Sequence, residues 1–211
     1  FARVRQRLTW GGGTNRRPPI PGRYHGSEAV RAFTGVDVPN MDTNLMLHRA
    51  GVSMQRRALG QRPMVVLAPG GAKNDMREES LRRWPLDCYA QLAASLVQEG
   101  CAVRIVGAPS DDWVRSAFAD MPVEDRVGQT DLLGLMALLK DGDVLVTHDS
   151  GPLHLGYLVG VKCVALFGPT MPSEKVPPGG PVQVHWGGAS LNCRPCYDGR
   201  SYAACADAAC M

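Results

Sequence analysis

The segment 149–154 gathers side chains that could bind or react with a ligand. An apolar run, 144–147, comes just before it, and an apolar stretch with helical spacing follows it. This pattern predicts a strand, a polar turn and then a helix. The segment therefore lies at the carboxyl end of a strand, where open α/β sheets bind their ligands. Its chemistry-bearing residues are Asp149, Ser150, Gly151 and His154.

Two interpretations of this segment stay open. Backbone N–H groups at a helix N-terminus, here at Ser150 and Gly151, form an anion site. Asp149 either caps that helix or accepts a hydrogen bond from a sugar hydroxyl. His154, one turn further on, either points into the same pocket or packs in the core. The segment thus predicts one wall of a ligand site.

A glycine-bearing loop follows the first expected strand, 64–68. Its residues Gly70, Gly71 and Ala72 would let backbone N–H groups approach a phosphate closely. The loop matches neither the G-x-G-x-x-G fingerprint nor the Walker A sequence, so an ordinary tight turn explains it equally well.

Two arginines and an aspartate extend the predicted site. Arg82 and Arg83 precede the expected start of a helix at Trp84-Pro85. Guanidinium forks match phosphate oxygens, so this pair suits a diphosphate, although both could be surface arginines. Asp111 or its neighbour Asp112 follows the second expected strand, where nucleotide folds often hold a ribose diol. Helix capping explains these aspartates nearly as well.

Strand and helix patterns alternate from residue 63 to about residue 170. Alternation with short turns predicts a parallel sheet covered on both faces. The expected fold class is therefore α/β, with a Rossmann-like parallel sheet and helices on both faces. The expected strands are 64–68 and 101–106 and those near Val144 and Val164, and helices are expected after Trp84-Pro85, Ser110, Asp131 and Ser150.

Composition narrows the classes of function. The 211 residues are 45% hydrophobic and carry a formal net charge of +3. Lysines and arginines are mostly scattered, which argues against a nucleic-acid partner. A basic stretch, 3–23, is either a solvated or partly disordered arm or an electrostatic contact with anionic lipid or a phosphorylated acceptor. We expect no signal peptide, because no apolar core follows the basic start, and no membrane span, because no apolar run approaches roughly eighteen residues.

The seven cysteines fall into two groups. Three lie in apolar context and are expected to be buried free thiols, which favours a reduced compartment. The other four lie within the last nineteen residues and begin with a C-x2-C pair. Two pairs of thiolates can hold structural Zn or Fe, and free or disulfide-linked thiols are the alternative. The four are Cys193, Cys196, Cys205 and Cys210.

Three segments together resemble glycosyltransferase family 9, the ADP-heptose:lipopolysaccharide heptosyltransferases of Gram-negative bacteria. They are 82–85, 149–155 and 164–170, in this order and spacing. The resemblance covers about residues 63–210 and, more loosely, residues from 40. It implies the C-terminal, donor-binding half of a two-domain GT-B architecture. The implied divisions are 1–62 as part of the acceptor-side domain with a linker, 63–180 as the nucleotide-sugar-binding domain and 181–211 as a Cys-rich segment.

The resemblance also implies a reaction. Heptose would pass with inversion from ADP-heptose to a lipopolysaccharide core acceptor at the inner-membrane surface, with no cofactor required for catalysis. The resemblance thus implies a cytoplasmic protein that can be peripheral to the inner face of the inner membrane. The family's general base is an aspartate of the N-terminal domain, and no position of this chain matches it. The alternatives are a transferase with another nucleotide-sugar or a protein acceptor, and a nucleotide-binding module without activity.

The resemblance further assigns roles to residues. Relatives often carry a similar C-x2-C pair, and one that glycosylates autotransporters uses such cysteines for iron. Arg82, where the family commonly has lysine, would neutralise the leaving diphosphate. The phosphate end of the donor would lie against Gly70, Gly71 and Ala72, and other donor contacts would come from Asp111, Asp149, Ser150, Gly151, His154 and Thr170.

Overall fold

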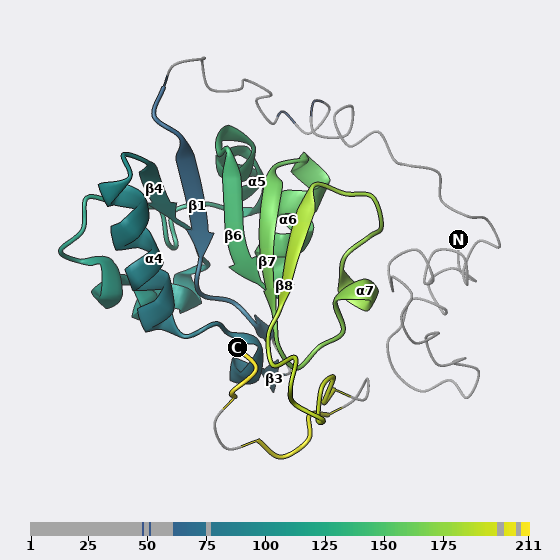
Figure 1. Ribbon diagram of the computed structural model, residues 1–211. Helices are drawn as coiled ribbons and strands as arrows, with labels where there is room; N and C mark the ends of the chain where they lie inside the picture. The colour runs from purple at the N-terminus through teal and green to yellow at the C-terminus, as the bar shows by residue number, and fades with distance from the viewer. Residues whose placement is uncertain (1–47, 49–50, 52–60, 75–76, 198–200, 206–207) are drawn as a thin grey trace.

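A six-stranded sheet forms the centre of the molecule (Figure 1). The computed structural model describes residues 48, 51, 61–74, 77–197, 201–205 and 208–211. The strand order is β5-β4-β1-β6-β7-β8, and each neighbouring pair is parallel. This is the 3-2-1-4-5-6 order of the Rossmann fold, which confirms the predicted fold class. The strands are β1 (Met64–Ala68), β4 (Ala102–Ile105), β5 (Glu124–Asp125), β6 (Val144–His148), β7 (Lys162–Phe167) and β8 (Val182–Trp186).

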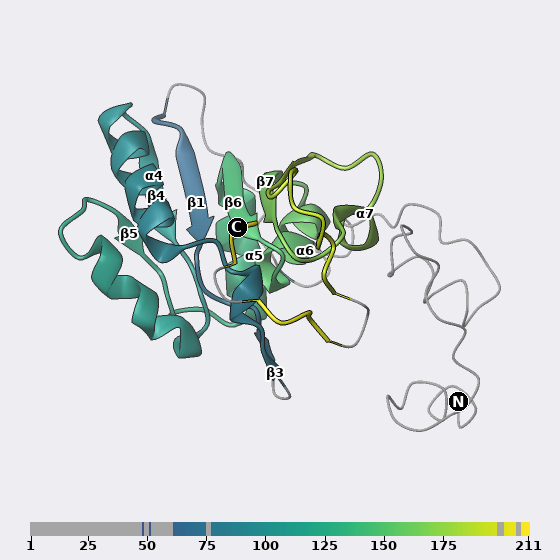
Figure 2. The same ribbon diagram turned by 60° about the horizontal axis from the view of Figure 1, so that its bottom comes forward.

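Helices cover both faces of the sheet, as predicted (Figures 1 and 2). Side chains of β1 alternate between the faces because successive residues of a strand point in opposite directions. Leu67 packs in the cluster that contains Tyr89, whereas Val66 packs in the cluster that contains Leu139. One face carries α4 (Leu86–Gln98) and the 3-10 helix η2 (Pro109–Phe118), and the other carries α5 (Leu132–Asp141) and α6 (Gly151–Val159).

Several short elements escaped the sequence analysis. β5 has only two residues, and its Glu124 is held by the buried Arg104 of β4 at 2.9 Å. β8 is an edge strand with three exposed residues, and it pairs with β7. The sheet therefore continues beyond residue 180, where the predicted α/β domain ended. The remaining short elements are the hairpin of β2 (Lys73–Asn74) and β3 (Arg77–Glu78), the 3-10 helix η1 (Ser80–Arg82) and α7 (Pro172–Lys175).

Three further expectations concern the helix after Ser110, the N-terminal part of the chain and membrane-spanning helices. The helix expected after Ser110 is present as the 3-10 helix η2. The predicted acceptor-side part, 1–62, lies almost entirely outside the described residues. Within the described residues, every helix is too short or too polar to cross a bilayer.

The C-terminal segment lies across the carboxyl ends of the strands (Figure 1). Arg194 stacks on the ring of Trp186 at 4.0 Å and donates to the carbonyl of Gly187 at 2.7 Å. The backbone N–H of Cys196 donates to the carbonyl of Pro169 at 3.0 Å. These contacts attach the Cys-rich segment to the ends of β7 and β8.

The contact between α6 and the sheet depends on Gly156. A Cβ atom there would lie 2.6 Å from Leu145 Cδ2 and 2.9 Å from Cys163 Sγ. We expect Gly156→Val to lower the free energy of unfolding by about 1–3 kcal/mol, because overpacking a filled core forces neighbours apart. Urea denaturation measures this. The control is Gly151→Ala in the same helix, where the added Cβ meets nothing within 4 Å; equal loss in both variants would contradict the packing argument.

Candidate functional site

The predicted site residues meet where the strand order reverses. β4 and β5 extend from one side of β1, while β6, β7 and β8 extend from the other. Ligands of open α/β sheets bind at the carboxyl ends of the strands at this point. The loop after β1 and the turn after β6 touch there, since a Cβ on Gly71 would lie 3.3 Å from Ser150 Cβ. The structure thus brings the glycine loop and the start of α6 together.

Few residue types can replace the glycines of this loop. Gly71 has a φ of +83° and Ala72 a φ of +53°, both in the left-handed region. A Cβ on Gly70 would lie 2.4 Å from Asp111 Cγ. Gly70 is therefore required for close approach, and Gly71 is favoured by its backbone conformation.

Asp111 braces this loop. Its side chain is buried, Oδ1 accepts from the N–H of Gly71 at 2.9 Å, and Oδ2 accepts from the N–H of Ala108 at 2.8 Å. The capping alternative from the sequence is therefore present, with the added effect that the carboxylate joins the β1 and β4 loops. A contact between Asp111 and a ribose stays a prediction.

Asp149 is buried in a small polar network. Thr170 Oγ1 donates to Asp149 Oδ2 at 2.8 Å, and Arg82 Nη1 lies 3.4 Å from the same oxygen. Ser150 is the N-cap of α6, but its Oγ contacts Thr147 Oγ1 at 3.2 Å instead of capping the helix. The structure thus brings Asp149, Thr170 and Arg82 together at the start of a helix whose N-cap side chain is engaged elsewhere.

The two arginines differ in their surroundings. Arg82 Nη2 pairs with Glu79 at 2.8 Å, and its Nε is buried without a hydrogen-bond partner among the described residues. Arg83 Nε donates to the carbonyl of Gly71 at 2.9 Å, and its guanidinium lies 5.1 Å from the ring centroid of Trp113. Arg83 therefore supports the glycine loop, while Arg82 faces the network of Asp149.

His154 lies on an exposed part of α6, which excludes the core-packing interpretation. Desolvation by the surrounding protein lowers the pKa of His154, Asp149 acts in the opposite direction, and the positive charges of Lys175 and Arg82 add to the lowering. The imidazole therefore lies within electrostatic range of the predicted site. Gly151 is exposed at the first position of the same helix.

A buried pair of side chains beneath the site was not predicted from the sequence. His148 is fully buried at the end of β6, and its Nδ1 lies 3.2 Å from the hydroxyl of Tyr89. Burial lowers the pKa of His148 to about 4, against a smaller raising effect of Asp149. The imidazole is therefore neutral at pH 7. Its position before the Asp149 motif was the available signal, but a lone histidine in an apolar strand is ambiguous.

No disulfide joins the four C-terminal cysteines, which are all among the described residues and close enough to influence one another. Burial raises the pKa of Cys210, and the neighbouring Cys196, Cys205 and Cys193 add to that effect. The N–H of Ala208 donates to Cys205 Sγ at 3.3 Å. Within the described ranges, no three His, Cys, Asp or Glu side chains are arranged to hold a metal ion. Of the other cysteines, Cys163 is buried, whereas Cys88 and Cys101 are only half-buried, not buried as expected.

The fold and the site define a class. A parallel sheet in Rossmann order, with a glycine loop and a helix N-terminus at its switch point, is the architecture of nucleotide-binding domains. The chain belongs to glycosyltransferase family 9 (heptosyltransferase), whose sequence model matches residues 24–206. This confirms the resemblance found in the sequence.

Individual relatives agree with the family. Lipooligosaccharide heptosyltransferase 2 of Haemophilus influenzae is 33% identical over 130 residues, covering 58% of this chain and 36% of that protein. The protein of the same name from Haemophilus ducreyi is 26% identical over 211 residues, covering 84% of this chain and 58% of its own length. The chain thus spans 36% and 58% of the lengths of these two relatives.

Two solved structures share the fold at 25% identity. A family 9 glycosyl transferase from Veillonella parvula matches with a TM-score of 0.53, covering 68% of this chain and 38% of that one. The ADP-heptose lipopolysaccharide heptosyltransferase II of Escherichia coli matches with a TM-score of 0.54, covering 72% and 44%.

Burial of His148 makes stability depend on pH. Because its folded pKa of about 4 lies below the ordinary 6.5, the unfolded chain binds a proton that the folded chain excludes. The resulting stability is present above about pH 6.5 and is lost as the pH falls toward 4, by about 2 kcal/mol between pH 7.5 and pH 5. We expect His148→Asn to remove most of this loss in urea denaturation. His154→Asn, at an exposed site, should retain most of the loss of stability at low pH. If the unchanged chain, His148→Asn and His154→Asn show the same pH dependence, the loss does not come from His148.

Proposed function

We propose that this chain is the donor-binding part of a heptosyltransferase that transfers heptose from ADP-heptose to a lipopolysaccharide core acceptor. The observation that carries the proposal is the meeting of Arg82, the glycine loop and the start of α6 at the switch point. Membership of family 9 supports the reaction class. The description of the Escherichia coli relative as an ADP-heptose enzyme supports the donor.

The leaving diphosphate is the group that these residues suit best. Sugar transfer places growing negative charge on the β-phosphate, and fixed cationic or N–H groups stabilise that charge. Arg82 supplies a guanidinium whose Nε has no partner within the described residues. The first N–H groups of α6 supply the positive end of a helix dipole. This arrangement lets departure of the nucleotide proceed without a catalytic metal.

Asp149 and Thr170 suit the sugar. Their side chains form one buried pair, in which Thr170 donates to a carboxylate oxygen of Asp149. The hydroxyl fixes one oxygen, so the other oxygen of Asp149 can accept from a sugar hydroxyl. Inversion also needs a general base on the acceptor side. We assign that base, as in the GT-B architecture, to an acceptor-side domain opposite this one, with the acceptor presented at the cytoplasmic surface of the inner membrane.

Nucleotide binding by the 211-residue chain tests this proposal. We expect calorimetry to detect ADP binding, and Arg82→Ala to weaken it by about ten- to a hundredfold, because hydrogen bonds to charged groups contribute about 1.5–3 kcal/mol. Arg82→Lys should lose less, since the charge remains. Arg126→Ala, which removes an exposed arginine paired with Glu124 on β5, is the matched control. Tighter binding of UDP than of ADP would instead favour a transferase with another nucleotide-sugar, and absence of nucleotide binding would refute the proposal.

We also propose a structural Zn or Fe ion on the Cys-rich segment. Four cysteine thiols are the ligand set of a closed tetrahedral site. In the described residues they are near one another but not arranged as a three-ligand cluster, so binding of the ion would have to draw them together. The ligands would be Cys193, Cys196, Cys205 and Cys210, and the ion would fix this segment.

Elemental analysis of the purified protein tests this metal proposal. We expect about one equivalent of Zn or Fe, and Cys196→Ser should lower the content several-fold. Cys88→Ser, at a half-buried thiol on α4, should leave it unchanged. Protein that carries no metal after anaerobic purification would refute the site.

A further inference from the structure

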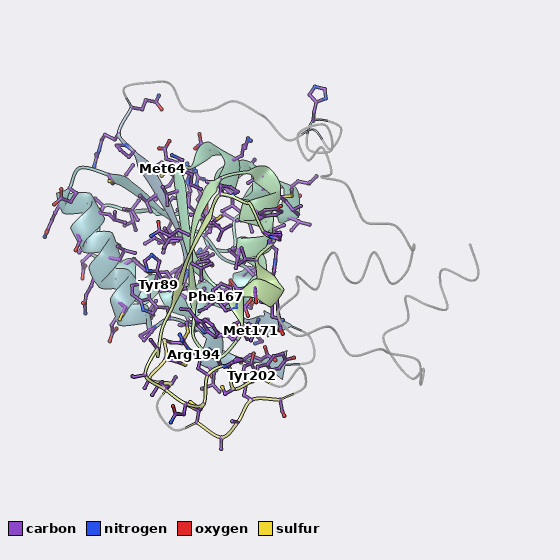
Figure 3. The ribbon with its side chains drawn as sticks, turned by 45° about the vertical axis from the view of Figure 1, so that its right-hand side comes forward. Met64, Tyr89, Phe167, Met171, Arg194 and Tyr202 are labelled. Atoms are coloured by element: carbon purple, nitrogen blue, oxygen red, sulfur yellow. The ribbon has the colours of Figure 1, made fainter. Side chains whose placement is uncertain are left out.

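One side chain of the Cys-rich segment reaches the proposed donor site. The hydroxyl of Tyr202 donates to Glu79 Oε2 at 3.0 Å, across 123 positions of sequence. The same oxygen, Oε2, pairs with Arg82 Nη2 at 2.8 Å. Figure 3 shows Tyr202 beyond Phe167 at the carboxyl end of the sheet, far from Met64 at the opposite end. Tyr202 is therefore joined through one carboxylate to the arginine assigned to the diphosphate.

The contact belongs to a continuous row of polar groups. From Arg82 the row continues through Nη1 to Asp149 Oδ2 at 3.4 Å, and from there to Thr170 Oγ1 at 2.8 Å. It runs from the Cys-rich segment through η1 to the ends of β6 and β7. Arg82 thus lies between two carboxylates, and its contact with Glu79 is the shorter one.

The chemistry of Tyr202 suits a fixed donor. Burial raises the pKa of Tyr202 above its ordinary value, and the nearby Glu79 and Asp149 add to this against the opposing effect of Arg82. The hydroxyl therefore keeps its proton at neutral pH and donates to Glu79. A carboxylate held from one side by a hydroxyl has fewer orientations available, so it fixes its second partner more firmly.

We propose that Tyr202 is a positioning residue for the donor diphosphate. Its hydroxyl orients Glu79, and Glu79 holds Arg82 Nη2 so that Nη1 faces the phosphate oxygens. Among the described residues, Nη1 has only its 3.4 Å contact with Asp149, and Nε is buried with no partner. The inference rests on the proposed function, because it assigns Arg82 to the diphosphate.

Other contacts anchor the segment without the hydroxyl. The rings of Tyr202 and Tyr197 lie 4.7 Å apart, and the N–H of Ala203 donates to the carbonyl of Cys196 at 3.0 Å. Tyr202→Phe keeps the ring and these contacts and removes only the donor to Glu79. The substitution therefore separates a positioning role from an anchoring role.

Binding of two ligands to the full 211-residue chain tests the inference. ADP carries the diphosphate and adenosine lacks it. We expect Tyr202→Phe to weaken ADP binding about three- to tenfold, the effect of one hydrogen bond, and to leave adenosine binding unchanged. In a Glu79→Gln background, Tyr202→Phe should change ADP affinity by less than about twofold, since the two residues act in series. The control is Tyr157→Phe on α6, where the ring packs against Gly180.

The outcomes separate this inference from the function beneath it. Equal ADP affinity of the unchanged chain and Tyr202→Phe would overturn the positioning role while leaving the donor site intact. Equal losses of affinity for ADP and adenosine would show an anchoring role for Tyr202 and would also overturn the positioning role. The same holds if Tyr202→Phe weakens ADP binding as much in the Glu79→Gln background as in the unchanged chain. An unchanged chain that does not bind ADP would overturn the proposed function and this inference together.

Discussion

The backbone of Gly71 is held at both its N–H and its carbonyl, and the geometry of the site depends on that restraint. Asp111 accepts from its N–H, and Arg83 donates to its carbonyl. These contacts fix a left-handed glycine against the turn of Ser150. Because Asp111 already accepts from the N–H of Gly71, the restraint fixes the shape of the loop and does not leave this N–H available to an anion. The glycine loop is therefore a preorganised element of the fold.

The same restraint explains why the surrounding residues are small. Asp111 lies against both Gly70 and Gly107, and a Cβ at either position would come within 3.0 Å of its side chain. The carboxylate thus occupies the space that two ordinary side chains would need. Its burial is tolerable because two backbone N–H groups satisfy it, as buried charges require. The carboxylate of Asp111 therefore both caps η2 and holds the glycine loop.

The sequence predicted the centre of the sheet well because buried parallel strands are continuous apolar runs. β1 is buried along its whole length, and its pattern left no competing interpretation. β5 and β8 escaped because one is two residues long and the other is largely exposed, so neither carries that signal. In the site, local motifs located Asp149 and Arg82. Glu79 and Tyr202 could not be found in the same way, because their importance arises from a contact between distant segments.

The separation of Glu79 and Tyr202 along the chain also bears on synthesis. Their hydrogen bond spans 123 positions, and the strands between them supply the sheet that brings them together. A chain made from its N-terminus exposes the glycine loop and Arg82 long before residue 202 leaves the ribosome. Contacts between distant segments form late, after their loop-closure entropy has been overcome. Until residue 202 has been made, Tyr202 cannot hold Glu79, and the carboxylate and its partner Arg82 stay open to solvent or to a chaperone.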